Sequence, residues 1–172
     1  MMLIGETTLN EIEEHLRCLG GGNHRDNMKR LQRFESYCSV SLTEEEFLEL
    51  VFLQNDEVLL ICPRGKNRTV RAVATRAIGL GQPRLTANWD LAENLFRMRE
   101  KLGSASIFKE KLVVCQAEND EEQYGTWYIR DGSHRALACA TLMLLNHAQY
   151  EPQRAYYSMS RRMYESLLNR AT

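Results

Sequence analysis

The stretch TWYIRDGSHRALACATLMLL, from Thr126 to Leu145, decides the fold. It opens with aromatic and β-branched residues, which favour a buried strand, and it closes with the apolar or near-neutral run Ala136–Leu145, which favours a helix. A polar pentad, residues 131–135, separates the two runs. The first amides of a helix point outward with about half a positive charge behind them, and they bind anions such as phosphate. The sequence therefore predicts an anion-binding turn at the pentad.

Length, charge and cysteine pattern limit the class of protein. A chain of 172 residues has the size of one domain, which we expect to span residues 1–172. The net charge of −1 excludes the overall basic character of a dedicated DNA-binding domain and leaves room for a local basic patch. The five cysteines have no CxxC spacing and mostly lie in apolar runs, which predicts buried thiols in a reducing compartment. Neither a signal-peptide pattern nor an apolar run of about 18 residues is present, so we expect a cytoplasmic protein without membrane insertion.

The first third of the chain, residues 1–55, is predicted to form a helical layer. Thr8 with Glu11 and Thr43 with Glu46 are capping-box pairs, each of which marks the start of a helix. After Thr8, apolar residues recur at helical spacing until three successive glycines end the run, and a further amphipathic helix follows the glycines.

The charge of the chain changes sign near the start of the expected core, residues 56–172. An acidic stretch, residues 44–57, is followed by a basic one, residues 64–88, which holds no acidic residue. We expect its basic side chains to contact DNA phosphates, and a solvated surface is the structural alternative. The candidate DNA-binding residues are Arg64, Lys66, Arg68, Arg71, Arg76 and Arg84.

Further elements follow from apolar runs and turn residues. The β-branched and leucine-rich run Val58–Cys62 predicts a strand, and Val70–Ile78 predicts another, although its alanines favour a helix. Asn88 is a good N-cap for a helix that ends at Gly103. The remaining predictions are strands at Leu112–Gln116, Thr126–Arg130 and Arg154–Met159, a helix from Ala136 and a closing helix from Ser160.

The order of these elements resembles the ParB/sulfiredoxin fold. The resemblance covers Val70–Met159 and is carried by a strand, the letters QPR, a helix ending in REKLG, the strands KLVVC and WYIRDGSHR, and an alanine-rich helix. Members of this family place a Gly-x-x-Arg-type turn between a strand and a helix and bind the phosphates of a nucleotide there. The resemblance implies an α+β fold, with a small mixed sheet and flanking helices, to which the helical N-terminal layer is added.

The resemblance also implies roles for the pentad. Gly132 would let the backbone approach a phosphate, and His134 and Arg135 would contact its oxygens from the first helical turn. The expected nucleotide-binding residues are Gly132, Ser133, His134 and Arg135. The expected catalytic residues are Asp131, His134 and Arg135. The implied cofactors are ATP, or another nucleoside triphosphate, and Mg²⁺ held by Asp131.

Two departures from the family patterns narrow the function. Sulfiredoxins carry a cysteine where this chain has Ser133, and a thiolate is required for their chemistry at sulfur, so that chemistry is not expected here. Partition proteins carry a DNA-binding and dimerisation region after the turn, and this chain ends at Thr172, so a full partition protein is not expected. Two branches remain: free-serine kinases with a DGHHR-like turn, and small plasmid-encoded proteins that interfere with DNA transfer, for which ATPase and DNase activities are expected.

The leading hypothesis is a nucleotide-binding phosphohydrolase, an ATPase, that also binds or cuts DNA and inhibits plasmid or T-DNA transfer. Its partners would be a nucleotide, DNA and a protein of a DNA-transfer machine, with Asp90 or Glu93 as a second carboxylate or base. One alternative is a small-molecule kinase that uses the same pocket on a free-serine-type hydroxyl. Another is a non-catalytic inhibitor that docks on a larger machine.

Each feature of the pentad also has a structural interpretation. Its Asp-Gly pair suits a plain turn with Ser133 as the helix N-cap. Two positive residues at a helix N-terminus cost up to about 1 kcal/mol each, which favours a bound anion beside His134 and Arg135. A second Gly-x-His-Arg sequence, Gly22–Arg25, follows a helix rather than a strand and is less typical of a site. No spacing is typical of a zinc site or predicts a serine-hydrolase triad.

Overall fold

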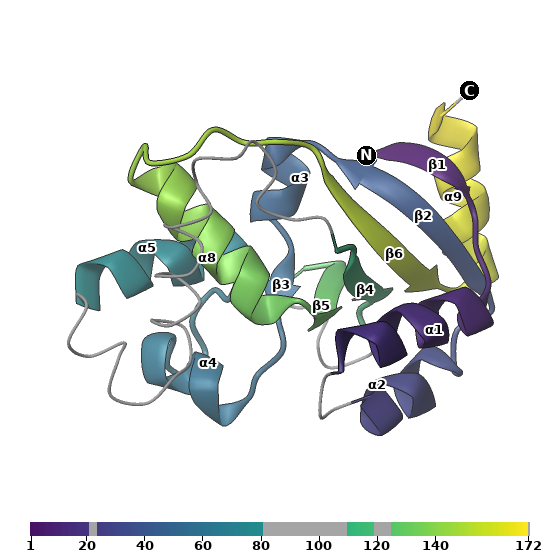
Figure 1. Ribbon diagram of the computed structural model, residues 1–172, viewed down its shortest axis with the longest axis horizontal. Helices are drawn as coiled ribbons and strands as arrows, with labels where there is room; N and C mark the ends of the chain where they lie inside the picture. The colour runs from purple at the N-terminus through teal and green to yellow at the C-terminus, as the bar shows by residue number, and fades with distance from the viewer. Residues whose placement is uncertain (21–23, 81–109, 119–124, 172) are drawn as a thin grey trace.

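The computed structural model describes residues 1–20, 24–80, 110–118 and 125–171, and within them it shows a six-stranded mixed sheet with helices on both faces, an α+β fold (Figure 1). The strands are β1 (Met2–Glu6), β2 (Ser36–Leu42), β3 (Val51–Phe52), β4 (Leu112–Gln116), β5 (Trp127–Asp131) and β6 (Gln153–Met159). The helices are α1 (Leu9–Leu19), α2 (His24–Leu31), α3 (Glu44–Leu48), α4 (Asp56–Ile61), α5 (Val70–Leu80), α8 (Ser133–Leu144) and α9 (Arg161–Ala171).

The sheet has the strand order β1-β2-β6-β4-β5-β3. The pairs β1/β2, β2/β6 and β4/β5 are antiparallel, whereas β4/β6 and β3/β5 are parallel. The chain therefore runs through the β4–β5 pair, crosses over by α8, and returns as β6 beside β4. This crossover places the pentad at the end of β5, where the chain leaves the sheet for α8.

Alternating side chains divide the core between the two faces of the sheet. Leu112 and Val114 pack in a cluster with residues of α3, α4, α5 and α8, and residues of α9 pack against that cluster. Val113 and Cys115 belong to a second cluster with residues of α1 and α2. Figure 1 shows the same arrangement, with α1 and α2 apart from the layer that holds α5 and α8.

The predicted helical layer over residues 1–55 needs correction. The helices α1 and α3 do begin at the expected capping boxes, where Thr8 accepts from the Glu11 amide at 3.2 Å and Thr43 accepts from the Glu46 amide at 3.3 Å. However, β1, β2 and β3 lie in the same segment, so it contributes half of the strands of the sheet. The strand β2 pairs along its length with β6, from the far end of the chain, and no local sequence pattern reports such a partner.

Two strand predictions in the middle of the chain are wrong, because both segments are helical. Asn55 caps α4 by accepting from the Val58 amide at 2.8 Å. Thr69 caps α5 by accepting from the Ala72 amide at 3.3 Å. The buried residues of α5 recur at helical spacing, so the alanines there indicate the correct structure. The strand in this part of the chain is β3, which was not predicted and which pairs in parallel with β5.

The second half of the chain follows the prediction more closely. The predicted Leu112–Gln116 strand is β4, and the strands predicted near residues 126–130 and 154–159 are β5 and β6 within one residue at each end. The helices α8 and α9 also occupy their predicted segments. The helix predicted from Asn88 to Gly103 lies outside the described residues.

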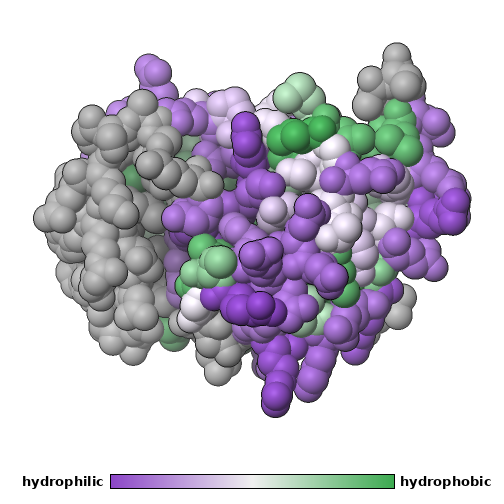
Figure 2. Space-filling model, turned by 45° about the vertical axis from the view of Figure 1, so that its right-hand side comes forward, coloured by the Kyte–Doolittle hydropathy of each residue, from purple (hydrophilic) through white to green (hydrophobic). Residues whose placement is uncertain are grey.

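The edge strand β1 leaves apolar side chains at the surface. Met2 is 66% exposed and Ile4 is 48% exposed, and Figure 2 shows apolar residues gathered along this side of the molecule, over β1 and α9. Within the described ranges, no helix combines the length and the apolar character that crossing a membrane requires.

The thiols divide into one exposed and four buried groups. Cys18 is exposed on α1, whereas Cys38, Cys62, Cys115 and Cys139 are buried. Burial raises the pKa of the Cys38 and Cys139 thiols to about 12. These two thiols therefore stay protonated near neutral pH and react poorly as nucleophiles.

We expect Ellman's reagent at pH 8 to modify one thiol rapidly in the folded protein and all five after denaturation, because only Cys18 is exposed. Absorbance at the wavelength of the released thiolate measures both phases. In the control variant Cys18→Ser, the fast phase should disappear and four thiols should react after denaturation. Fast modification of a second thiol in the folded protein would show that the buried cysteines are more accessible than this fold allows.

Candidate functional site

The turn between β5 and α8 depends on Gly132. Its φ of 90° and ψ of 16° are left-handed, a conformation that costs other residues about 1–3 kcal/mol. A Cβ atom at this position would lie 2.5 Å from Leu112 Cδ2 and 3.0 Å from Arg135 Nη2. The Gly132 carbonyl accepts the first helical hydrogen bond, from the Ala136 amide at 2.9 Å. Glycine is therefore required both for the turn and for the packing of β4 and Arg135 against it.

The Arg135 side chain folds back over this turn and meets two carboxylates. Its Nη2 lies 2.9 Å from Asp131 Oδ2, and its Nη1 lies 3.6 Å from Glu110 Oε2. The Arg135 and Asp131 side chains are 19% and 24% exposed, respectively, so solvent screens this pair only in part. Because the two carboxylates offset the charge of Arg135, this arginine does not need a bound anion to lie at a helix N-terminus.

The start of α8 differs from other helix starts because its N-cap residue has no side-chain acceptor. At the start of each of five other helices a side-chain oxygen accepts from a backbone amide of the first turn: Thr8 for α1, Thr43 for α3, Asn55 for α4, Thr69 for α5 and Ser160 for α9. Gly132 makes no such bond, and the first turn of α8 holds no acidic residue. The helix therefore presents its positive end without the usual cap.

Glu110 is a neighbour of the pentad that no pattern in the sequence singled out. Asp131 pairs with Val113 across the β4–β5 ladder, so the residues just before β4 lie next to the end of β5. A prediction that β4 and β5 pair antiparallel would have placed Glu110 beside the end of β5. Arg130 was also missed: it points to the α1–α2 face, is 6% exposed, and donates from Nε to Cys115 Sγ at 2.7 Å.

Three of the predicted DNA-binding arginines are held by protein groups. Arg68 is 5% exposed and donates to the Gln54 side chain at 3.4 Å, so it is not a surface contact. Arg71 pairs with Glu45 at 2.7 Å, on α3. Arg76 donates to the Asn67 carbonyl at 2.8 Å.

Two of the predicted DNA-binding residues are presented to solvent. Arg64 and Lys66 are exposed on the loop between α4 and α5, and no carboxylate of the described residues lies within 4 Å of either. The sixth candidate, Arg84, lies outside the described residues, as do Asp90 and Glu93.

Asp131 is the residue of the pentad that could hold a metal ion. No group of three or more histidine, cysteine or acidic side chains in the described part of the chain is arranged to hold a metal. Mg²⁺ commonly uses only one or two carboxylates, with nucleotide phosphates and water as the other ligands. The Asp131 carboxylate fits that partial role, in competition with Arg135.

No family model matches the chain, and no curated protein or solved structure gives a significant match. The resemblance to the ParB/sulfiredoxin fold stays a prediction.

We expect Gly132→Ala to lower the free energy of unfolding by about 2–4 kcal/mol, because a left-handed alanine is strained and its Cβ overlaps Leu112. The matched control is Gly65→Ala. Gly65 has a φ of 75° and nothing within 4 Å of an added Cβ, so only the backbone strain of about 1 kcal/mol should remain. Urea denaturation followed by circular dichroism measures both. Equal losses would mean that the close packing at Gly132 adds nothing.

Proposed function

We propose that the chain binds a nucleoside triphosphate at the β5–α8 turn and hydrolyses it, as an ATPase that also contacts DNA. The observation that carries the proposal is the start of α8, where a glycine stands in place of the side-chain cap found at five other helices and the first turn contains His134 and Arg135. A phosphate group would accept from the amides of that turn and would take the place of the missing cap.

A bound phosphate would change the partners of the Arg135 side chain. A phosphate beside Gly132 would compete with Asp131 and Glu110 for the guanidinium, whose five N–H groups can serve more than one acceptor. Release of Asp131 from Arg135 would free a carboxylate for the Mg²⁺ that accompanies the nucleotide. Phosphate charge would then be neutralised by the helix amides, Arg135 and the ion, which is the main requirement of phosphoryl transfer.

We expect isothermal titration to detect ATP binding in the presence of Mg²⁺, and His134→Ala to weaken it about tenfold through the loss of one contact to a charged group. The control is Arg161→Ala, because Arg161 is a first-turn arginine of α9 whose side chain is 78% exposed. The Arg161→Ala variant should bind ATP with the same affinity as the unchanged protein. Parallel titrations with ADP and CTP test the phosphate and base dependence.

Three results would decide against this proposal. If ATP, ADP and CTP all fail to bind, the turn is a structural joint and the docking alternative gains. If ATP binds but His134→Ala has no effect, the nucleotide lies elsewhere. If ATP binds and phosphate is released only when a free hydroxy amino acid is added, the chain is a kinase.

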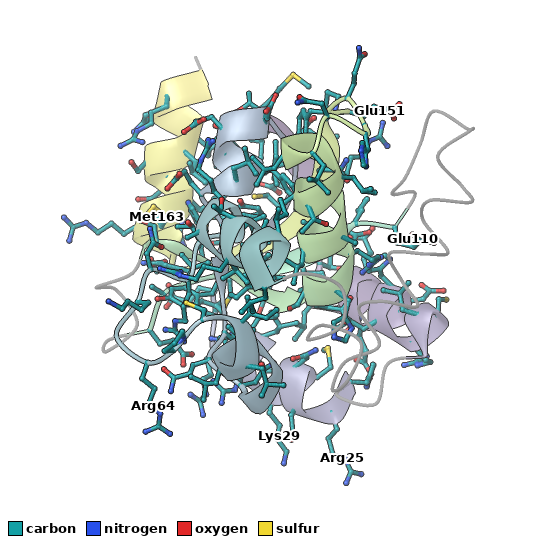
Figure 3. All side chains as sticks on the ribbon, turned by 90° about the vertical axis from the view of Figure 1, so that its left-hand side faces the viewer. Arg25, Lys29, Arg64, Glu110, Glu151 and Met163 are labelled. Atoms are coloured by element: carbon teal, nitrogen blue, oxygen red, sulfur yellow. The ribbon has the colours of Figure 1, made fainter. Side chains whose placement is uncertain are left out.

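The proposed DNA contact lies at one end of the molecule. Figure 3 shows Arg25, Lys29 and Arg64 extending from the same end, and Figure 1 shows α2 and α4 on that lower side, apart from each other. Lys29 has a distant acidic neighbour, Asp26 at 3.9 Å, which is 81% exposed and therefore well screened. With Lys66 this end presents exposed positive charge of the kind that follows a phosphate backbone.

We expect a double variant, Arg64→Ala with Lys66→Ala, to bind DNA more weakly and to reduce the slope of log affinity against log salt by about 2, because each lost phosphate contact removes about 0.9. Gel shifts or fluorescence anisotropy at several salt concentrations measure the slope. The charge-matched control, Arg154→Ala with Arg162→Ala, changes exposed residues of β6 and α9 and should leave the slope unchanged. An equal change in both double variants would show that net charge alone is responsible.

A further inference from the structure

The six-stranded sheet has one covered edge and one open edge. At the β3 edge the segment before α5 lies alongside: Val51 forms a bridge with Thr69, and the Phe52 amide donates to the Arg68 carbonyl at 3.0 Å. At the other edge, β1 pairs with β2 on its inner side, and no strand of the described residues pairs with its outer side. The main-chain groups on the outer side of β1 can therefore pair with a further strand.

Most of the features that keep an open edge from pairing are absent from β1. Its sequence, MLIGE, contains neither lysine nor proline, and its only charged residue, Glu6, lies at the end of the strand. A bulge between Leu3 and Gly5 shortens the regular part of the strand without covering it. Met2 and Ile4 are 66% and 48% exposed, so pairing along this edge would also remove apolar surface from water.

The helix α9 extends this apolar surface. The Tyr164 hydroxyl donates to Glu6 Oε1 at 2.8 Å, which places the first half of α9 at the end of β1. Leu168 lies one helical turn beyond Tyr164 on the same side of α9 and is 37% exposed. Figure 2 shows apolar residues gathered over both elements. A partner that pairs with β1 would therefore also meet the exposed side of α9.

Exposed charges of opposite sign stand at the two ends of this surface. Glu6 lies at one end of β1, and Arg170 lies at the other, because Arg170 lines the same cavity as Met1 and Leu3. Both side chains are exposed, and neither lies within 4 Å of an oppositely charged group in the part of the chain that the structure describes. Each end of the surface therefore offers a charge that a partner can pair.

A second copy of the chain complements this surface. When two β1 strands pair in antiparallel direction about a two-fold axis, Ile4 lies opposite Ile4 of the partner subunit. The Glu6 end of each strand then meets the Met2 end of the other, which brings Glu6 near Arg170 of the partner subunit, twice in each dimer. Glu6 pairs across the ladder with Cys38 and contacts Tyr164, so it lies on the α9 face of the sheet, and a two-fold axis perpendicular to the sheet keeps both α9 helices on that face.

We propose that the protein forms a two-fold symmetric dimer through antiparallel pairing of β1 with β1 of a second copy. The two sheets join into one, the exposed apolar side chains of β1 are covered, and Glu6 pairs with Arg170 of the partner subunit. The proposed phosphate turn follows β5, and β2, β6 and β4 lie between β5 and β1 in the sheet. The dimer therefore forms without nucleotide.

Analytical ultracentrifugation over a range of protein concentrations, without nucleotide, tests this proposal. We expect a reversible equilibrium between monomer and dimer. Ile4→Lys should raise the dissociation constant at least about a hundredfold, because each dimer loses two apolar contacts and gains two like charges at the axis. The matched control is Leu60→Lys, because Leu60 is an apolar residue of α4 that is 56% exposed, and it should leave the constant unchanged. Circular dichroism verifies that both variants fold.

An exchange of charges tests the antiparallel arrangement. Glu6→Arg and Arg170→Glu should each weaken the dimer about tenfold, because each change places like charges together at both ends of the interface. The protein with both changes should recover the original affinity, since the pair is restored with its signs reversed. Tyr164→Phe removes the hydrogen bond to Glu6 but keeps the charge of Glu6, so it should leave the affinity unchanged.

The proposal fails under any of three results. Monomers at every concentration would show that β1 does not pair with a second copy and that a different protein is needed to cover this edge. Equal weakening by Ile4→Lys and Leu60→Lys would place the interface elsewhere. Lack of recovery in the protein with both charge changes would exclude the antiparallel pairing. None of these results depends on ATP binding, so failure here and failure of the nucleotide proposal are distinguishable.

Discussion

The close approach of β4 to the β5–α8 turn is the constraint on which the structure depends. Leu112 packs against the position that a side chain at 132 would occupy, and Arg135 covers the same turn from the helix. Only glycine combines the left-handed backbone with this contact. The direction in which α8 leaves the sheet follows from the turn, and α8 in turn packs on α5 and carries the chain back to β6.

The same contacts make the turn both a structural joint and a candidate phosphate site. Arg135 stabilises the joint through Asp131 and Glu110, and these are the groups from which a phosphate and its metal ion would have to separate it. The Arg135–Asp131 pair is only 19% and 24% exposed, so removing one partner would leave the other charge poorly solvated. Exchange of carboxylate for phosphate would keep Arg135 paired with an anion, whereas a side chain at position 132 would strain the turn itself.

Local signals in the sequence predicted helix starts well and sheet partners poorly. Thr8 and Thr43 fix their helices through residues three positions away, so the pattern and the structure agree. Val58–Cys62 has strand-forming composition, but the cap at Asn55 and burial against α5 make it helical, which composition alone does not report. The strands β1 and β2 depend on β6 from the opposite end of the chain. For the same reason the pentad was visible in the sequence, whereas the position of Glu110 beside it became visible only in the folded sheet.

The strand β5 ties the candidate turn to the rest of the sheet. Trp127 and Asp131 stand at its two ends, about 13 Å apart at about 3.3 Å per residue, with the fully buried Ile129 between them. The strand is held by β4 on one side and by β3 on the other. A shift of β5 toward α8 would also drive the turn at Gly132 against Leu112, where no space remains. The packing that requires glycine at the turn therefore also fixes the backbone of Asp131, and any rearrangement around a bound phosphate would be confined to side chains.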